Sequence, residues 1–558
     1  MMPGQGQVIT TTGVGSGLGT AENGLDYDFL VIGSGFGGSV AALRLAEKGY
    51  RVAVLEKGKS YRSQDFPKTN RKLSKFVWMP RLGLYGIQVL SLFRHVFILS
   101  GCGVGGGSLV YANNLLVPPD EVLTKPGWGP GDWKSRLAPH YDRARRMLGA
   151  VEAPSVGRGD EVLAQVCREL RGEETFHLNQ VGIYFGQPGQ TVEDPYFEGQ
   201  GPERTGCTFC GACMIGCREG AKNTLDKNYL HLAQGLGMEI LPEQEVVGVK
   251  PLNPDRPEGG YQVRARKSTG FGGRGRTLTA KGVVFSGGVL GTLKLLLRCR
   301  EKGFLPFLSP RLGEGVRTNS EALLTVTARD PQADYSDQIA ITSGVYPDER
   351  THIEVVRYNK GSDVMGGLVT LLTDGGGRLP RGLRFLGQAA AHPVRFLKSI
   401  WIPNWAARTT ILLVMQTKEN AVRMELKRRW WRMGGKALGT ALVPGTRPAP
   451  AYIPVANEVA RRMAQKLDGV AMSAWTEALF NISSTAHILG GAAMGAGPEE
   501  GVADFQGRVH GYPGLYVADG SVVPVNLGVN PSLTITALAE YIMSLIPERG
   551  GEREGRGR

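Results

Sequence analysis

An apolar run, Phe29–Ile32, is followed by three closely spaced glycines and then by apolar residues at helical spacing. The run predicts a buried strand, and Ala42, Leu45 and Ala46 mark the buried face of the helix that follows it. A second apolar run, Val52–Leu55, completes a strand–helix–strand pattern. This order predicts a βαβ unit with two parallel strands.

The pattern changes between about residue 320 and residue 470. Apolar and polar positions alternate there in segments such as Ala322–Thr327 and Thr410–Met415, among Gly-rich and Pro-rich turns. Alternation of this kind predicts an antiparallel sheet. After about Ala474 the glycine-dense style of the first part returns.

These patterns predict an α/β chain (α+β overall) in which a Rossmann-type dinucleotide-binding domain is interleaved with a mainly antiparallel-sheet domain for the substrate. The predicted parts are a flexible leader, 1–25; the first part of the dinucleotide domain, 26–319, with a cysteine-rich insertion, 204–220; the substrate domain, 320–474; the second part of the dinucleotide domain, 475–547; and a disordered tail, 548–558. A chain of 558 residues is too long for one hydrophobic core, which agrees with this division.

The glycines after the first strand form the pattern G-x-G-x-x-G, at Gly33, Gly35 and Gly38. The first glycine allows a tight turn, the second lets the backbone approach a pyrophosphate, and the third lets the helix pack against the strand. Glu56 ends the second strand, where a carboxylate can accept hydrogen bonds from ribose hydroxyls. The pattern therefore predicts a dinucleotide site, without separating NAD from FAD.

Composition narrows the class of protein. The 80 glycines do not recur at a fixed period, which excludes collagen. The chain has no run of 18 apolar residues, so no membrane-spanning helix is predicted. The net charge of +14 comes without a nucleic-acid-binding module, so no nucleic-acid partner is expected. A generally basic surface explains the charge, with attraction to phosphates or to an anionic membrane as the alternative. The first residues lack a signal-peptide pattern, which predicts a cytoplasmic protein whose cysteines are reduced or bind metal.

Four of the seven cysteines, Cys207, Cys210, Cys213 and Cys217, form the pattern C-x2-C-x2-C-x3-C. The spacing matches the cysteine run of a ferredoxin-type [4Fe–4S] cluster. Arg218 stands where the usual proline would follow, and the chain has no second set of cysteines. Zinc binding and a set of reduced thiols that pack a turn are the alternatives.

The G-x-G-x-x-G fingerprint is accompanied by three further segments: 101–114 (GCGVGGGSLVYANN), 284–296 (VFSGGVLGTLKLL) and 515–540 (LYVADGSVVPVNLGVNPSLTITALAE). Together they resemble the glucose–methanol–choline (GMC) family of flavin oxidoreductases, and within it the cholesterol oxidases. The resemblance implies FAD as the cofactor and oxidation of an alcohol carbon by hydride transfer to the flavin N5. One departure is Tyr111, which stands where an asparagine is usual, with Asn113 two residues on.

The resemblance also implies which residues hold the cofactor. They are Gly105, Gly106 and Ser108 at the flavin and pyrophosphate, Val247 at the adenine through its backbone, Asp519 and Gly520 at the ribityl and phosphate region, and Asn530, Pro531 and Leu533 beside the isoalloxazine ring.

Alcohol oxidation needs a group that takes up the hydroxyl proton, and histidine suits this task because its unperturbed pKa is about 6.5. His487 matches the family's HPLGG-like motif, with Ile488 in place of the proline. The resemblance implies that His487 orients the hydroxyl and accepts its proton, and that Asn530 donates to the substrate oxygen or tunes the flavin. A core histidine satisfied by the backbone is the alternative. For the carboxylate that moves a proton when a steroid double bond shifts, Asp363 is the expected residue and Glu354 the alternative; an acid on a loop can also be merely solvated.

The resemblance predicts a bulky hydrophobic alcohol as the substrate, such as a 3-hydroxysteroid, and oxygen as the electron acceptor. The alternatives are an iron–sulfur-linked alcohol dehydrogenase for another lipid or terpenoid alcohol, and an inactive flavin-binding or redox-sensing protein. In residues 381–408, Arg and Lys alternate with Phe, Leu and Trp. Such a segment predicts either peripheral contact with a membrane or a lid packed on the substrate pocket.

Overall fold

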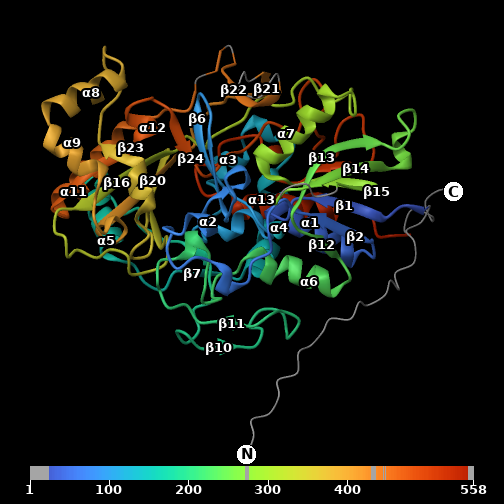
Figure 1. The fold of residues 1–558 in the computed structure, drawn as a ribbon, viewed down its shortest axis with the longest axis horizontal. Coiled ribbons are helices and arrows are strands. Elements are labelled where there is room, and N and C mark those ends of the chain that lie inside the picture. Colours follow the sequence, from blue (N-terminus) through green and yellow to red (C-terminus); the bar gives the residue numbers. More distant parts are fainter. Residues whose placement is uncertain (1–23, 271–274, 429–434, 444, 447, 551–558) are drawn as a thin grey trace, which may run out of the picture.

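The computed structural model of the chain describes residues 24–270, 275–428, 435–443, 445–446 and 448–550 (Figure 1). Residues 1–23 of the predicted leader and residues 551–558 of the predicted tail lie outside the described residues.

The predicted βαβ unit forms the start of the first sheet. β1 (Tyr27–Ile32) and β2 (Val52–Leu55) pair in parallel, and every residue of both strands is buried. α1 (Phe36–Glu47) connects them and begins directly after Gly35. The apolar runs and the glycine turn of the sequence therefore predicted this unit correctly.

Strands from distant parts of the chain complete the first sheet. Their order is β12 (Glu239–Leu241), β2, β1, β15 (Arg276–Phe285), β14 (Tyr261–Lys267) and β13 (Gln244–Pro251), with β25 (Leu515–Val517) paired to β15. β12, β15 and β25 join in parallel, whereas β14 and β13 are antiparallel. Because β25 comes from the C-terminal part, both predicted parts of the dinucleotide domain share this sheet.

Helices pack against both the sheet and one another. α1 packs against α6 (Tyr229–Gly235) and α13 (Ser532–Ser544), and α13 packs in turn against α4 (Trp133–Leu148). α7 (Gly288–Glu301) packs against β13 and lies above the sheet in Figure 1, with α6 below it. The long C-terminal helix α13 thus returns to the N-terminal unit and closes the first core.

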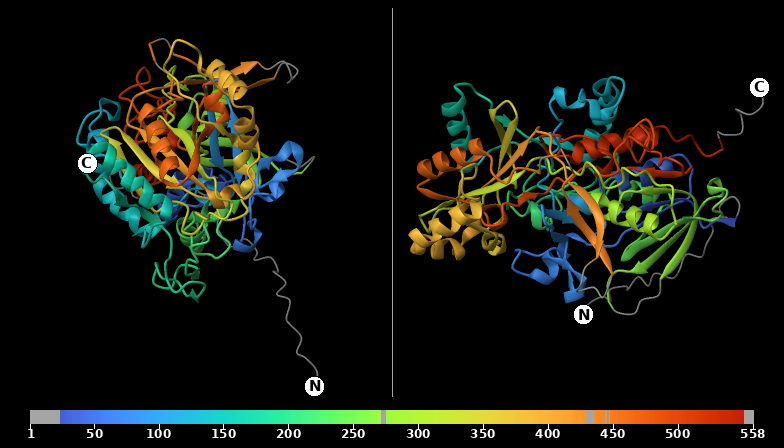
Figure 2. Two further views of the ribbon diagram at one scale, coloured as in Figure 1. Left: turned by 90° about the vertical axis from the view of Figure 1, so that its left-hand side faces the viewer. Right: turned by 90° about the horizontal axis from the view of Figure 1, so that it is seen from above.

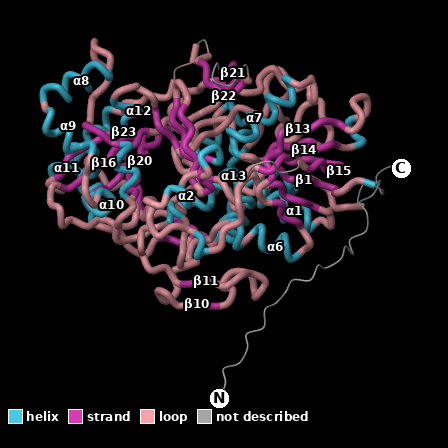
Figure 3. Tube along the Cα trace, in the orientation of Figure 1, coloured by secondary structure: helices cyan, strands magenta, loops and turns pink. Residues whose placement is uncertain are grey.

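The second sheet is antiparallel throughout the described residues. Its order is β19 (Val369–Leu371), β23 (Gly469–Ala474), β16 (Ala322–Ala328), β20 (Thr409–Gln416), β18 (Thr351–Val356), β17 (Ser343–Asp348) and β8 (His177–Leu178). The antiparallel pairing of β16 with β20 confirms the prediction from alternating polarity. The strands of the two sheets lie at opposite sides of the molecule (Figure 3).

The two domains are more interleaved than the sequence pattern predicted. α5 (Arg158–Arg171), from the segment assigned to the dinucleotide domain, packs with α11 (Pro454–Lys466) on the second sheet. Conversely, β21 (Arg423–Arg428), from the segment assigned to the substrate domain, contacts α7. α8 (Arg381–Ala391) and α9 (Pro393–Ile400) lie beyond the second sheet, at the end of the molecule away from the first (Figure 2).

A further strand group lies between the sheets. β24 (Ser483–Thr485) pairs in parallel with β6 (Val96–Gly101), which pairs with β5 (Gln88–Leu92). β24 also contacts β16 of the second sheet. The chain that leads into His487 therefore runs between the two domains.

Candidate active site

In the fingerprint loop, Gly33 to Gly38, the first and last glycines pack against neighbouring backbone, whereas Gly35 faces open space. Gly33 has a φ of +100°, and a Cβ there would lie 2.3 Å from the carbonyl oxygen of Ser286, so only glycine fits. A Cβ on Gly38 would lie 2.0 Å from the Gly33 oxygen. Gly35, by contrast, has no atom within 4 Å of the position its Cβ would take. This opening lies at the start of α1, where backbone amides can bind a pyrophosphate.

A second glycine loop meets the first. A Cβ on Gly106 would lie 2.6 Å from the Cα of Gly35. The hydroxyl of Ser34 donates to the Glu56 carboxylate at 2.8 Å and accepts from the amide of Gly105 at 3.1 Å. Glu56 is buried beside the end of β2, the place expected for a contact with ribose. The two loops form one wall in front of α1.

A buried amide without a partner follows the second loop. Asn113 is fully buried, and neither Oδ1 nor Nδ2 of its side chain is hydrogen-bonded within the described residues. A buried polar group without a partner is costly, so this position calls for a polar ligand group. The pyrimidine edge of a flavin carries donors and acceptors of this kind. The residues present therefore fit FAD.

The C-terminal segment packs onto the start of α1. A Cβ on Gly37 would lie 1.5 Å from the carbonyl oxygen of Ala518. Asp519 caps the short helix η11 (Gly520–Val522) and accepts from the hydroxyl of Thr292 at 2.6 Å. The predicted ribityl and phosphate residues thus lie next to the fingerprint loop.

Val247 and Ser108 were also expected at the cofactor, and they differ in whether their polar groups are free to bind it. The pairing of β13 with β14 skips Val247, which leaves its backbone groups outside the ladder, as a contact with adenine would require. The hydroxyl of Ser108 donates to Gly105 at 2.7 Å and accepts from the amide of Leu225 at 3.0 Å. The side chain of Ser108 therefore braces the glycine loop.

His487 is held by a buried carboxylate. Its Nδ1 is hydrogen-bonded to Oε1 of Glu321, whose other oxygen accepts from the amide of Ala486 at 2.8 Å. Burial alone would lower the pKa of His487, but the charge of Glu321 and the hydrogen bond to it outweigh burial, so the pKa is raised. Because Nδ1 is taken up, Nε2 is the ring nitrogen that can act on a substrate.

A second carboxylate, Glu354 of β18, is surrounded by asparagines. It accepts from Nδ2 of Asn530 at 3.1 Å. It also accepts from Nδ2 of Asn114 at 2.6 Å and from Nδ2 of Asn179 at 3.0 Å. Burial raises the pKa of Glu354 to about 7, although these hydrogen bonds act in the opposite direction. Its charge also contributes to the raised pKa of His487, so the two groups share one electrostatic environment.

Asp363, the carboxylate expected from the sequence, lies elsewhere. It begins the helix η9 (Asp363–Leu368), forms an ion pair with Arg71 and accepts from the amide of Ala406 at 2.9 Å. The structure places the alternative, Glu354, beside the expected catalytic residue Asn530. Of the two acids, the structure therefore brings Glu354, and not the expected Asp363, to Asn530.

The residues that hold these groups were not predicted from the sequence. These residues, Glu321, Asn114 and Asn179, are all buried. Asn114 closes the segment GCGVGGGSLVYANN, whereas Glu321 and Asn179 stand outside the motifs on which the prediction rested. The one available signal was an acid, Glu321, directly before the apolar strand β16. Pro531 and Leu533 were expected beside the flavin and lie at the start of α13.

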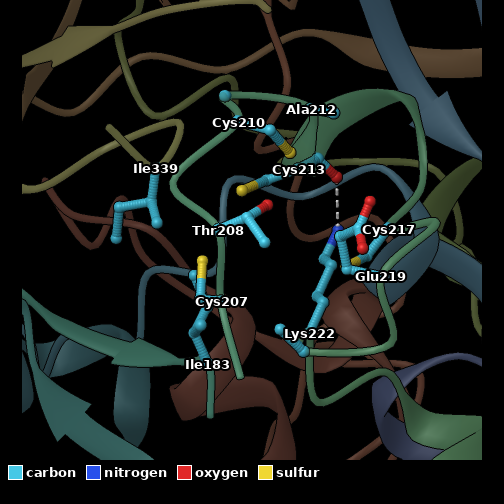
Figure 4. A pocket seen from close by; sticks show the side chains of 12 residues that line it. Ile183, Cys207, Thr208, Cys210, Ala212, Cys213, Cys217, Glu219, Lys222 and Ile339 are labelled. Atoms are coloured by element: carbon cyan, nitrogen blue, oxygen red, sulfur yellow. Dashed lines mark hydrogen bonds between the residues drawn. The ribbon is translucent and has the colours of Figure 1, made fainter. Parts of the chain in front are cut away.

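The four cysteines of the insertion line one cavity together with Thr208 and the buried Lys222 (Figure 4). Burial raises the pKa of Cys207 to about 12 and that of Cys213 to about 11. Among the residues that the structure describes, no three potential ligand side chains converge closely enough to hold a single metal ion. The cysteines are thus gathered around one space, though not around one point.

The segment 381–408 presents an apolar face to its surroundings. The exposed large side chains of α8, α9 and the turn after them are Leu383, Leu386, Val394, Leu397, Ile400 and Trp401, the last 80% exposed. The other side packs Phe385 and Phe396 against Trp475. In the part of the chain that is described, no helix combines the length and the apolar character needed to cross a bilayer.

Comparisons with known proteins cover almost the whole chain. The family model described as "GMC oxidoreductase" matches residues 415–539, and one described as "FAD binding domain" matches residues 28–66. The chain is 47% identical over 538 residues to a cholesterol oxidase of Mycobacterium tuberculosis, which covers 94% of this chain and 92% of that protein. It is 44% identical over 535 residues to a cholesterol oxidase of Acinetobacter baumannii, with 94% and 95% covered. The structure of pyridoxine 4-oxidase from Mesorbium loti matches with a TM-score of 0.56 at 14% identity, covering 93% of this chain and 98% of that one, which is a likeness of fold.

Proposed function

Because the chain belongs to the GMC family of flavin oxidoreductases and is an FAD-dependent enzyme acting on CH–OH groups, we propose that its substrate is a 3-hydroxysteroid such as cholesterol and that oxygen accepts the electrons. Two relatives named cholesterol oxidase, at 47% and 44% identity, support this choice. The structural observation that carries it is the buried Glu354 beside Asn530. A simple alcohol needs no second proton carrier, whereas a steroid whose double bond moves does.

FAD, when bound, supplies the acceptor for the hydride that leaves the alcohol carbon. His487 takes the hydroxyl proton at Nε2. Glu321, hydrogen-bonded to Nδ1, fixes the orientation of the ring and stabilises the charge that the ring gains. The raised pKa of His487 makes the ring a stronger base for this step. Asn530, held between Asn114 and Glu354, offers its amide to the substrate oxygen.

Glu354 is the proposed carrier for the double-bond shift. After oxidation, it takes a proton from the carbon next to the new carbonyl group and returns it to the far end of the double bond. A carboxyl with a pKa of about 7 can both accept and release a proton near neutral pH. The three asparagine amides keep its oxygens in place, because each donates to the carboxylate.

The exposed face of α8 and α9 is the proposed contact with a membrane. Leu397 and Trp401 are exposed on it, beside the exposed Arg395 and Lys398. Apolar side chains flanked by cations suit an anionic bilayer surface, from which a nearly insoluble sterol can be collected. The exposure of these side chains supports surface contact over the alternative of a lid packed on the substrate.

A second candidate for the acceptor arises from the four cysteines that line one cavity. An iron–sulfur cluster there would carry the two electrons of each oxidation, one at a time, to a one-electron carrier protein. Under this candidate the enzyme is a dehydrogenase, and peroxide is not its product.

Anaerobic bleaching of the bound flavin by a panel of sterols and long-chain alcohols tests the proposal. We expect 3-hydroxysteroids to bleach the flavin fastest, and admission of oxygen to restore the colour with one peroxide per oxidation. Faster bleaching by a straight-chain alcohol would refute the steroid substrate. Bleached flavin that oxygen fails to restore would refute oxygen as the acceptor.

A further inference from the structure

We propose that Cys207, Cys210, Cys213 and Cys217 ligate an iron–sulfur cluster, with Lys222 as its buried counter-charge and its link to the flavin-binding segment. The redox role of this cluster rests on the second candidate for the electron acceptor within the proposed function, but the site itself stands on its own geometry.

The arrangement of the sulfurs favours a cluster over a single ion. All four cysteines come from one loop and line one cavity, with their side chains around a common space in Figure 4. Zinc needs four ligands at about 2.3 Å from one point, and the described side chains do not converge in this way. A cubane cluster presents four irons at separate corners, so its thiolate ligands stand further apart.

A backbone amide of the loop points at one of the sulfurs. The amide of Phe209 donates to Sγ of Cys207 at 3.4 Å, and Phe209 adopts a φ of +56°, which is uncommon for a residue with a side chain. Hydrogen bonds of this kind stabilise negatively charged sulfur and tune the potential of clusters.

Lys222 supplies the charge that such a site requires. It is 1% exposed and lines the cysteine cavity. Its Nζ donates to the carbonyl oxygens of Cys213 and Tyr111, each at 2.8 Å, and to that of Leu109 at 3.2 Å. None of the ion pairs found among the described residues includes Lys222, although Glu219 lines the same cavity and the charge of Asp226 acts on the lysine. Four thiolates around iron would supply negative charge next to this buried cation, in addition to the charge of Asp226.

The same lysine joins the cavity to the flavin-binding segment. Leu109 and Tyr111, which accept two of its hydrogen bonds, lie between the second glycine loop and the unpartnered Asn113. Nζ of Lys222 also lies 4.7 Å from the ring centroid of Tyr111. A cluster at the cysteines therefore lies next to the chain segment that holds the flavin, which is the position an electron exit needs.

Metal analysis of the full chain, purified without oxygen, tests the site. We expect about four irons and four acid-labile sulfides per chain, and a low-temperature EPR signal after reduction by dithionite. Cys210→Ser removes a ligand that is exposed and so is not needed for core packing. We expect this variant to lose the iron and sulfide but to keep its FAD. The matched control, Cys167→Ser, changes a buried cysteine outside the loop whose contact with the Thr175 hydroxyl a serine can keep, and we expect it to retain both.

Lys222→Gln tests the counter-charge. We expect the midpoint potential of its cluster to be more negative than in the wild type, because the reduced cluster loses a neighbouring cation. An unchanged potential would refute the role of Lys222. If this variant does not fold, the metal content of the wild type and of Cys210→Ser still decides the site.

Three results would overturn the proposal: zinc without sulfide, no metal after reconstitution with iron and sulfide, or full iron content in Cys210→Ser. Flavin bleaching by cholesterol is measured on the same samples. Bleaching without iron refutes the cluster alone, whereas iron without bleaching refutes the proposed substrate alone.

Discussion

Nδ2 of Asn530 donates to the carboxylate of Glu354 at 3.1 Å, although the two residues are 176 positions apart in the chain. Asn530 precedes α13 in the flavin-binding part, whereas Glu354 lies within β18 of the second sheet. This hydrogen bond therefore joins the two domains at the candidate active site. The charges of Glu321 and Glu354 both raise the pKa of His487, which lies on the segment between the sheets.

Glu354→Gln is expected to separate oxidation from the double-bond shift. The amide keeps the shape of the side chain but cannot carry a proton, so we expect the shift to slow by at least about 100-fold while flavin bleaching stays within about tenfold of the wild type. The ketosteroid with the unshifted double bond then accumulates, as chromatography of the products would show. Asp363→Asn is the matched control and is expected to change neither step. A shift that is lost in Asp363→Asn and kept in Glu354→Gln would reverse this assignment.

Glu321→Gln is expected to move the acid limb of the pH–rate profile to lower pH. Glu321 raises the pKa of His487, so its neutral isostere lets that pKa fall. The ring accepts a proton only when it is unprotonated, and the limb follows its pKa. We also expect the maximal rate to fall by about 100-fold, because the charged ring loses its stabilising partner.

Anaerobic flavin reduction, measured from roughly pH 5 to pH 9, checks this prediction. The control is Glu477→Gln, a buried carboxyl that accepts from the amide of Leu323 and whose pKa burial raises to about 8. It is expected to leave the limb in place. An unmoved limb in Glu321→Gln would refute the prediction that Glu321 raises the pKa of His487.

Gly35→Ala and Gly33→Ala are expected to fail for different reasons. Gly35 has a φ of −73°, which alanine adopts readily, and its Cβ would meet no protein atom. We therefore expect a folded chain whose FAD affinity is at least about tenfold weaker, or ~1.4 kcal/mol. In Gly33→Ala the Cβ meets the backbone of Ser286, so we expect loss of folded protein. Flavin titration and thermal melts distinguish the two, and a yellow, tightly bound Gly35→Ala would contradict a cofactor at this opening.

The sequence predicted those parts of the fold that depend on local pattern. The apolar runs around Gly33 and the alternation in β16 and β20 correspond to observed strands. These features are local, because burial on one or both faces fixes the spacing of apolar residues. The interleaving of the two domains was predicted but not its extent, since the packing of α5 on the second sheet depends on contacts between distant segments.

The same distinction applies to the site. His487 and Asn530 were predicted because they stand in motifs, and the structure brings Glu354 rather than the expected Asp363 to Asn530. Both acids occupy the same stretch of sequence, and only the fold shows that one pairs with Arg71 on the surface while the other is buried among amides. Glu321 was missed because its partner is 166 residues away.

Replacing Leu397 and Trp401 together by serine is expected to weaken binding to anionic phospholipid vesicles. Both side chains are exposed, and each apolar side chain that enters a bilayer interface contributes about 1.5–3 kcal/mol, so a loss of at least tenfold is expected. Vesicle co-sedimentation measures it. The control is Phe307→Ser, an apolar side chain that is 78% exposed outside this segment. Equal binding by the double variant and the wild type would leave the segment without a role at membranes.

The rate at which cholesterol bleaches the flavin without oxygen, compared between the wild type and His487→Ala, decides whether His487 takes up the hydroxyl proton. We expect a yellow variant that binds FAD as the wild type does but is bleached at least about 100-fold more slowly, because no group takes up the hydroxyl proton. Bleaching of His487→Ala at the rate of the wild type would contradict the assignment of the proton acceptor.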